Sequence, residues 1–418
     1  MRTTPKSRGP CACWGAPLAG KPSARSSFVY HGRRQVVWRT ETEPQPACNR
    51  HRNSATDTAV AIFMPEILPA TTGRTHALDG GRAAADKGRT MPSEMVYPKA
   101  IKPGDSVCFC TPSLPIVPNR KERIDRRQAC VEWAAALELK PVFAPNFARH
   151  SEVYSHESRK MRVDDFNFAL DYPFVSIVGG GGGAISLLDG IDYDKARRNR
   201  PVVMGMSDQT KIVNAIAAKA GLVTFYGPNG GFGHWYQADG NPRKDFFTQK
   251  TLEEIRSALW EHKAHLAPTG GEEDAAWKPL ELRPEKFGCP EVLEGMTFGG
   301  HWNAAAQTMS GTEYFPRPEG RKLIFLEALH DVVLNNFIAF ERMRIMGYWR
   351  DAALLCGGPF WEKPGDAVRQ GLMDYCARHG IPLVYHLRFG HFHPISVLPV
   401  GAQARFDTRS LKLTWKGE

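Results

Sequence analysis

The chain has 418 residues, 42% of them hydrophobic and 23% charged, which is typical of a soluble globular protein. Its net charge of +10 is concentrated in residues 1–90, which hold 14 of the 54 Lys and Arg but 6 of the 44 Asp and Glu. The remaining chain is nearly balanced, so we expect no basic surface for nucleic acid. No apolar run is long enough to span a bilayer, which argues against a membrane protein.

Residues 1–90 are rich in Arg, Ser, Thr, Pro, Gly and Ala and show little hydrophobic periodicity. Three interpretations fit: a disordered tail, a targeting peptide, or a segment outside the working protein, with translation starting at Met91 or Met95. We favour the third, because both methionines lie just before the first clear strand. No apolar segment follows the first basic residues, so a secretory signal is not expected. We assign residues 1–95 to a disordered or non-native extension.

Strand and helix patterns alternate over the next part of the chain, which predicts an α/β domain with a parallel sheet of Rossmann or flavodoxin type. Short apolar runs indicate strands, and apolar residues three or four apart indicate helices. We expect strands at 106–110, 140–144, 174–178 and 201–204, and helices at 120–138, 158–170, from 184 onward, 211–220 and 251–265. Ligands of such sheets bind beyond the carboxyl ends of the strands.

Beyond Gly227 the pattern changes to a Gly- and Pro-rich loop and then to shorter strands interrupted by a helix. The strands are expected at 323–326, 353–356, 382–385 and 396–400, and the helix at 332–346. We therefore predict an α/β nucleophile domain over 96–265, a linker over 266–285 and a β-rich, barrel-like domain over 286–418.

The segment Gly205-Met-Ser207-Asp208 lies where an apolar strand turns into a helix. A serine at such a corner projects its hydroxyl clear of the backbone, beside the N–H of the next residue. This arrangement suits a nucleophile with half of an oxyanion hole. The alternative is an ordinary helix cap, in which Ser207 or Asp208 satisfies free N–H groups.

Five consecutive glycines, residues 179–183, follow the preceding strand. Ahead of a helix, such a run could cradle a phosphate. It lacks the Lys-Ser/Thr pair of a P-loop, so a loop that supplies a backbone N–H to an oxyanion is the better interpretation. A flexible turn remains the alternative.

Two further segments offer partners for a nucleophile. His391, in a loop between two strands, is a candidate general base, and Glu327 ends an apolar strand where a carboxylate is unusual without a partner. His391 and His393 could also pair on a metal. However, His262 and His265 lie on a separate predicted helix without a nearby carboxylate cluster, so we expect no metal and no cofactor.

Together these motifs resemble the LD-carboxypeptidases, a family that includes the microcin C self-immunity peptidases. The likeness runs from about residue 101 to 407. The motifs that carry it, in order, include Ile101-Lys-Pro-Gly-Asp105, Thr111-Pro-Ser113, Leu187-Leu-Asp-Gly-Ile-Asp-Tyr-Asp194, Gly205-Met-Ser-Asp-Gln-Thr210, Gly221-Leu-Val-Thr-Phe-Tyr-Gly-Pro228, Phe298-Gly-Gly300, Ile324-Phe-Leu-Glu327 and Gly390-His391.

The resemblance implies a serine peptidase with a triad of Ser207, His391 and Glu327. His391 is chosen over His393 because it follows Gly390, as the family pattern has it. The resemblance also implies an active site at the junction of an N-terminal α/β domain and a β-rich C-terminal domain, and usually a homodimer.

The same resemblance implies an oxyanion hole formed by the N–H of Asp208 and that of Gly180 or Gly181. The sequence departs from the family where Gly-Gly-Asn becomes Gly299-Gly-His301, so a substrate-binding amide is replaced by His301 or shifted to Asn303.

We therefore expect a cytoplasmic serine carboxypeptidase that cleaves an amide near the C-terminus of a small peptide, such as an L,D bond in peptidoglycan recycling. One alternative is an amidase for aminoacyl-nucleotide amides, as in microcin immunity, with Trp235, Tyr236 and Trp302 stacking on the base. A non-catalytic ligand-binding relative and a nucleotide-binding regulator are the others. The nine cysteines lack paired spacing, which favours free thiols in a reducing compartment.

Overall fold

The structure, a computed structural model, describes residues 91–92, 94–114, 126–147, 149, 153–230, 246–274, 278–328, 336–358 and 367–417. All of them belong to one compact unit, residues 82–418. The extension assigned to residues 1–95 lies almost wholly outside the described residues and stays a prediction.

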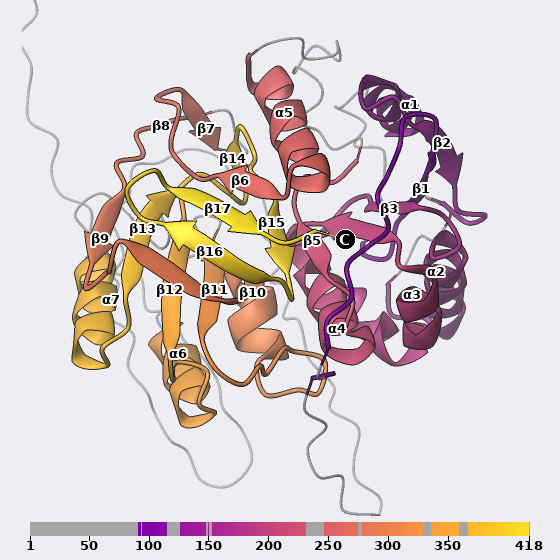
Figure 1. Ribbon diagram of the computed structural model, residues 1–418. Helices are drawn as coiled ribbons and strands as arrows, with labels where there is room; N and C mark the ends of the chain where they lie inside the picture. The colour runs from indigo at the N-terminus through magenta and orange to yellow at the C-terminus, as the bar shows by residue number, and fades with distance from the viewer. Residues whose placement is uncertain are drawn as a thin grey trace, which may run out of the picture. The chain divides into compact units, whose positions relative to one another are not determined.

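The first sheet has six strands in the order β15-β5-β4-β3-β1-β2 (Figure 1). Five of them are parallel and are the strands of the predicted α/β region, whereas β15 is antiparallel to β5. Their bounds are β1 Ser106–Cys110, β2 Lys140–Phe143, β3 Phe174–Ile177, β4 Val202–Gly205, β5 Thr224–Tyr226 and β15 Leu398–Val400. The parallel α/β sheet expected from the sequence is therefore confirmed.

Helices connect these strands much as the periodicity predicts. Their bounds are α1 Arg126–Ala136, α2 His156–Ala169, α3 Tyr193–Asn199, α4 Thr210–Ala220 and α5 Phe246–Trp260, with η1, a 3₁₀ helix, at Ala184–Gly190. The prediction for 251–265 was wrong at its end, because α5 stops at Trp260 and His262 adopts a left-handed φ of 53°. A residue in that conformation ends a helix, and a strand follows.

The second sheet has eight strands in the order β6-β17-β16-β10-β11-β12-β13-β9. Strands β10 to β13 are parallel, and the flanking strands are antiparallel. Their bounds are β6 Lys263–His265, β17 Lys412–Trp415, β16 Gln403–Asp407, β10 Val292–His301, β11 Lys322–Glu327, β12 Ala352–Gly357, β13 Leu383–Leu387 and β9 Glu285–Phe287. The β-rich C-terminal region is confirmed.

Strand β10 is the longest strand described and was not predicted. It carries three glycines, Gly295, Gly299 and Gly300, and glycine is depleted in strands because it adds backbone entropy and no packing surface. The expected barrel-like closure is not formed among the described residues, because the edge strands β6 and β9 each pair with one neighbour.

The remaining elements lie around the second sheet. Helices α6 and α7 alternate with its parallel strands, and a small third sheet occupies part of the predicted linker. Their bounds are α6 Asn336–Ile345, α7 Ala367–Arg378, the π-helix η4 Asn303–Met309, β7 Glu272–Asp274, β8 Pro279–Leu280 and β14 Phe392–His393.

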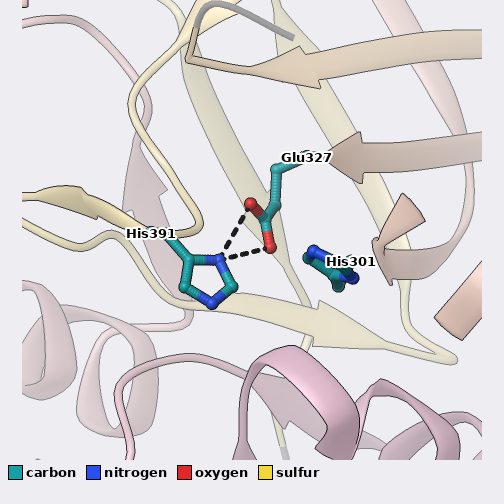
Figure 2. A group of neighbouring side chains, drawn as sticks. All are labelled: His301, Glu327 and His391. Carbon is teal, nitrogen blue, oxygen red and sulfur yellow. Dashed lines mark hydrogen bonds and ion pairs between the residues drawn. The ribbon is translucent and has the colours of Figure 1, made fainter. Parts of the chain in front are cut away.

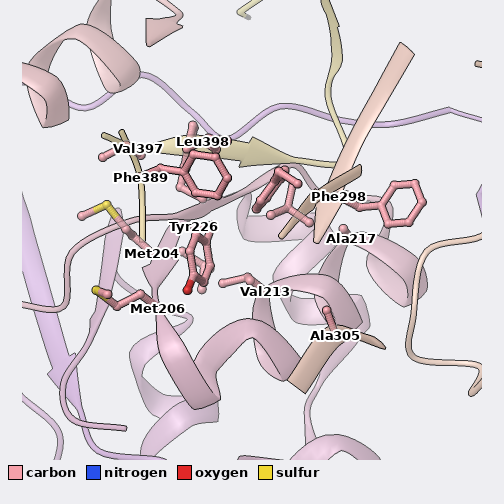
Figure 3. Close-up of a cluster of buried hydrophobic side chains, with 14 of the residues drawn as sticks. Met204, Met206, Val213, Ala217, Tyr226, Phe298, Ala305, Phe389, Val397 and Leu398 are labelled. Carbon is pink, nitrogen blue, oxygen red and sulfur yellow. The ribbon is translucent and has the colours of Figure 1, made fainter. Parts of the chain in front are cut away.

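The two sheets share one core. Helix α4 contacts β4 and β5 of the first sheet and β10 of the second, and nearly all of its side chains are buried. A helix buried over nearly its whole surface is expected between two layers of structure. Figure 3 shows Val213 and Ala217 of α4 near Phe298 of β10 and Leu398 of β15. The proposed domain boundaries stay a prediction, since β15 and β6 each join the sheet of the other region.

No helix within the described ranges combines the length and apolarity needed to cross a membrane. The six cysteines among the described residues are free.

Candidate active site

Ser207 lies at the carboxyl end of β4 with a φ of 63°, a left-handed conformation that is uncommon for a side chain other than glycine. A short 3₁₀ helix, η2 (Ser207–Gln209), follows and leads directly into α4. The corner is therefore the strand-to-helix turn that the sequence predicts. The helix-cap alternative was wrong among the described contacts, since neither Ser207 nor Asp208 caps η2 or α4 with its side chain.

The glycine run passes beside this serine. A Cβ placed on Gly180 would lie 3.4 Å from both Cβ and Oγ of Ser207. Two amide side chains bind the first glycine of the run. Nδ2 of Asn229 donates to the carbonyl of Gly179 at 2.7 Å, and Nε2 of Gln209 donates to the same oxygen at 3.4 Å. The structure therefore brings Gly180 to the Ser207 hydroxyl, as the sequence predicts for a close-approach loop.

The carboxylate of Asp208 fixes the serine corner to its surroundings. Its Oδ2 accepts the Ser113 hydroxyl at 2.6 Å and the main-chain N–H of Ala184 at 2.9 Å, and its Oδ1 pairs with Lys211. Ala184 follows the last glycine of the run. One buried carboxylate thus connects the serine corner to the end of the glycine loop.

Glu327 and His391 form a buried pair. Nδ1 of His391 lies 2.9 Å and 3.0 Å from the two carboxylate oxygens of Glu327 (Figure 2). Glu327 ends β11 and is fully buried, whereas His391 lies in the loop after β13. Gly390 permits this approach: its φ is 92°, and a Cβ there would lie 2.4 Å from Cγ of Glu327.

The charges around Glu327 favour the ionised carboxylate. Burial by itself would raise the pKa of Glu327, but the facing His391, the charge of His301 and the Tyr226 hydroxyl lower it from 4.5 to about 2. Burial, reinforced by Glu327, raises the pKa of Tyr226 well above its ordinary value. The Tyr226 hydroxyl therefore stays protonated, and it donates a hydrogen bond of 2.5 Å to Oε1 of Glu327.

Main-chain groups of Ser207 hold the serine corner, and one of them links it to this pair through Tyr226. Its N–H donates to the Tyr226 hydroxyl at 3.3 Å, and its carbonyl accepts the Thr210 hydroxyl at 2.7 Å. Among the described residues, no hydrogen bond joins the Ser207 hydroxyl directly to His391. The hydrogen bonds therefore connect Ser207 to the Glu327–His391 pair indirectly, by way of the Tyr226 hydroxyl.

The predicted substrate-binding residues have different outcomes. His301 ends β10 in register with Glu327, its ring centroid 5.5 Å from that of His391. Asn303 begins η4, and no hydrogen bond among the described contacts joins its side chain to the residues above. Trp235 and Tyr236 lie outside the described residues.

The prediction that Trp302 stacks on a base was wrong, because its side chain is fully buried. Its ring packs against that of Phe340, with the centroids 4.9 Å apart.

The one group of three possible metal ligands within the described ranges is His301, Glu327 and His391. The histidines considered from the sequence as further ligands lie elsewhere. His393 is on β14, His265 is on β6, and His262 directly precedes β6.

Several buried polar residues at this site were missed from the sequence: Tyr226, Asn229 and Ser113. Tyr226 pairs with Gly205 in the register of β5 and β4, so it ends its strand beside the serine corner. The available signal was position for Ser113 and Asn229, since each directly follows a proline. Tyr226 ends β5, a strand that was not predicted.

The fold and site define a two-sheet α/β protein with a serine corner next to a buried His–Glu pair. Two sequence profiles match this chain: the LD-carboxypeptidase N-terminal domain over residues 107–227 and the LD-carboxypeptidase C-terminal domain over residues 294–406. Together they cover more than half of the chain. The chain belongs to the LD-carboxypeptidase family.

Individual relatives are similar over most of their length. The microcin C7 self-immunity protein MccF of Escherichia coli is 25% identical over 331 residues, which cover 74% of this chain and 93% of MccF. A Bacillus subtilis protein named "Probable murein peptide carboxypeptidase" is 25% identical over 321 residues, covering 74% of this chain and 91% of that protein.

Solved structures agree in fold. Wild-type MccF without ligand superposes with a TM-score of 0.65 at 20% identity, covering 78% of this chain and 99% of that one. An MccF-like protein from Bacillus anthracis superposes with a TM-score of 0.61 at 21% identity, covering 77% of this chain and all of that one.

Proposed function

We propose that this chain is a serine peptidase that hydrolyses an amide bond near the C-terminus of a small peptide, with Ser207 as nucleophile, His391 as general base and Glu327 as the group that orients His391. The observation that carries the proposal is the left-handed serine corner, linked by Tyr226 to the buried His391–Glu327 pair. A nucleophile, a base and a group that orients the base are the parts that acyl transfer through serine needs.

In the proposed reaction, Oγ of Ser207 attacks the amide carbonyl carbon while Nε2 of His391 takes the hydroxyl proton. Nδ1 of His391 faces Glu327, so Nε2 is the nitrogen that remains for this transfer. His391 then gives the proton to the leaving amine, which departs from the acyl-enzyme. Water, activated by the same imidazole, hydrolyses the ester and restores Ser207.

The negative charge on the carbonyl oxygen requires donors fixed in advance. We propose the main-chain N–H of Asp208 and that of Gly180 or Gly181. The Asp208 carboxylate supports this role, because it bonds to the N–H of Ala184 just after the glycine run and so restricts the loop relative to Ser207.

The proposed substrate is a murein peptide with an L,D amide bond, consistent with the similarity to the murein peptide carboxypeptidase. A second candidate is an aminoacyl-nucleotide amide, because one of the similar structures is MccF in complex with aspartyl sulfamoyl adenosine. We propose that His301 and Asn303 contact the substrate in either case, with Trp235 contributing to a nucleotide site.

A fluorophosphonate probe tests the chemistry independently of the substrate. The full chain should be labelled at Ser207, and labelling should be lost in Ser207→Ala and fall at least a hundredfold in His391→Ala. His379→Ala is the matched control: its imidazole also faces a glutamate, with Nε2 3.8 Å from Glu341, but it lies just after α7. Equal labelling of the wild type and His391→Ala would reject the triad. No labelling of the wild type would favour a non-catalytic ligand-binding protein.

The substrate is tested by mass spectrometry of the products from an L,D tetrapeptide and from an aminoacyl sulfamoyl adenosine, each with Ser207→Ala as the blank. Cleavage of the first and not the second identifies the peptidase. The reverse identifies the amidase.

We also propose that the protein is a cytoplasmic homodimer. The free thiols of the described cysteines are compatible with a reducing compartment. Sedimentation velocity of the full chain and cell fractionation test the two parts separately.

A further inference from the structure

A third titratable side chain lies against the Glu327–His391 pair. His301 ends β10 and is the register partner of Glu327 at the end of the neighbouring parallel strand β11. Its ring is at 72° to that of His391, with the centroids 5.5 Å apart. Figure 2 shows the two imidazoles on either side of the same carboxylate.

These three side chains offer a recognised set of metal ligands. One ligand atom from each, an imidazole nitrogen from both histidines and a carboxylate oxygen from Glu327, all lie within 4.8 Å of one another. Two imidazoles and a carboxylate suit Zn²⁺, which binds both at about 2.0–2.2 Å. Ligand atoms at that distance from a tetrahedral ion are about 3.4 Å from one another. Small side-chain rotations are therefore enough to bring the three ligand atoms to the separation that the ion needs.

The position of His301 is fixed relative to the proposed nucleophile. Its main-chain N–H donates to the Thr210 hydroxyl at 3.0 Å, and that hydroxyl donates to the carbonyl of Ser207. His301 is half-buried, whereas Glu327 and His391 are buried. An ion bound by the three would therefore lie next to Ser207, with its fourth position open.

We propose that His301, Glu327 and His391 bind one Zn²⁺ ion and that the bound ion blocks the hydrolysis proposed above. Coordination through Nδ1 of His391 requires the other neutral tautomer, in which the proton that Nδ1 shares with Glu327 has moved, by exchange with solvent, to Nε2, and a water would take the fourth position. Nε2 would then carry a proton and could not accept one from Ser207. Glu327 could then no longer orient His391, and His391 would no longer be a free base. Binding is independent of the proposed function, whereas inhibition rests on it.

His301 is one position at which this chain departs from the family pattern given above. The family pattern that the sequence resembles has asparagine after the two glycines, and a neutral amide is a poor ligand for zinc. His301→Asn therefore removes one ligand while it keeps Ser207, His391 and Glu327 in place.

The first experiment measures binding. Untagged full-length protein, stripped with EDTA, is titrated with Zn²⁺ by isothermal calorimetry, in parallel with His301→Asn and with His379→Asn, the remote histidine–glutamate control. We expect one ion per chain for the wild type and for His379→Asn, and at least tenfold weaker binding for His301→Asn. Equal affinity in the wild type and His301→Asn, or no binding by the wild type, would overturn the proposal.

The second experiment measures inhibition as the rate of fluorophosphonate labelling of Ser207, each variant relative to its own rate without metal. Zn²⁺ should lower the labelling rate of the wild type at least tenfold. At the same free Zn²⁺ concentration, the labelling rate of His301→Asn should equal its rate without metal. A faster or unchanged wild-type rate with metal bound would overturn the inhibitory role. Absence of labelling without metal would instead contradict the proposed function, and the calorimetry would still decide the metal site.

A spectroscopic readout covers the case in which His301→Asn fails to fold, as judged by circular dichroism. Four-coordinate Co²⁺, with three protein ligands and a water, gives intense d–d bands at longer wavelength than the weak visible absorption of hexaaquo Co²⁺. The wild type should show these bands and lose them on addition of one equivalent of Zn²⁺, and His301→Gln should not show them. Bands that persist in His301→Gln would place the ion elsewhere and overturn the proposal.

Discussion

The hydroxyl of Tyr226 donates a 2.5 Å hydrogen bond to Oε1 of Glu327 and accepts the main-chain N–H of Ser207 at 3.3 Å. Tyr226 ends β5 in the first sheet, and Glu327 ends β11 in the second. One phenol therefore connects the two halves of the proposed active site.

Tyr226→Phe tests this connection. Loss of a hydrogen bond to a buried carboxylate should lower the free energy of unfolding by about 1.5–3 kcal/mol. Labelling of Ser207 by fluorophosphonate should fall by on the order of tenfold, which corresponds to about 1.4 kcal/mol in the barrier. Urea denaturation and labelling kinetics measure the two effects.

The matched control is Tyr348→Phe, another buried tyrosine, whose hydroxyl accepts the Gly311 N–H at 3.4 Å. It should cost about 1 kcal/mol of stability and leave labelling unchanged. If Tyr226→Phe labels as fast as the wild type, the phenol has no role in orienting the pair.

The left-handed φ of Ser207 predicts a stability difference between two variants that lack the proposed nucleophile. Ser207→Ala keeps a Cβ in the strained conformation, whereas Ser207→Gly removes it, so the glycine variant should be more stable by about 1 kcal/mol. Urea denaturation of both variants measures the difference. An alanine variant as stable as the glycine variant would mean that the corner holds no strain.

Gly180 and Gly182 provide a paired test of the glycine run. A methyl on Gly180 would touch Oγ of Ser207 at 3.4 Å, whereas one on Gly182 would meet nothing within 4 Å. Neither glycine has a left-handed φ, so alanine fits the backbone at both positions. Gly180→Ala should slow labelling on the order of tenfold with little change in thermal stability, and Gly182→Ala should slow it far less. Equal effects would mean that the approach of Gly180 to Ser207 does not matter for labelling.

The lowered pKa of Glu327 predicts a pH dependence of stability. Since the pKa falls from 4.5 to about 2 on folding, the carboxylate stabilises the fold fully above pH 4.5. This contribution is lost as the pH falls from 4.5 toward 2. The stability advantage of the wild type over Glu327→Gln should therefore narrow in that window, as urea denaturation at about pH 6, 4 and 3 would show. A constant difference across the series would contradict an ionised, stabilising Glu327.

The sequence identified Ser207, Glu327 and His391 as candidates because each stands at a local break: a strand-to-helix corner, a carboxylate ending an apolar strand and a histidine after a glycine. It missed Tyr226 and Asn229, because a buried polar side chain after a strand looks like an ordinary turn residue until its partner is known. It also missed β10, whose glycines argue locally against a strand. Gly299 is required there by packing, since a Cβ would lie 1.9 Å from the Phe325 carbonyl oxygen.

The sequence alone was sufficient to predict the parallel sheet, the serine corner and the family. These features show in apolar periodicity and short motifs, which depend on residues near one another in the chain. The encounter of Glu327 with His391, the bridging phenol of Tyr226 and the place of His301 depend on which strands become neighbours. That choice is made by burial of helix α4 and its packing against both sheets, a free-energy term summed over contacts between residues far apart in the sequence.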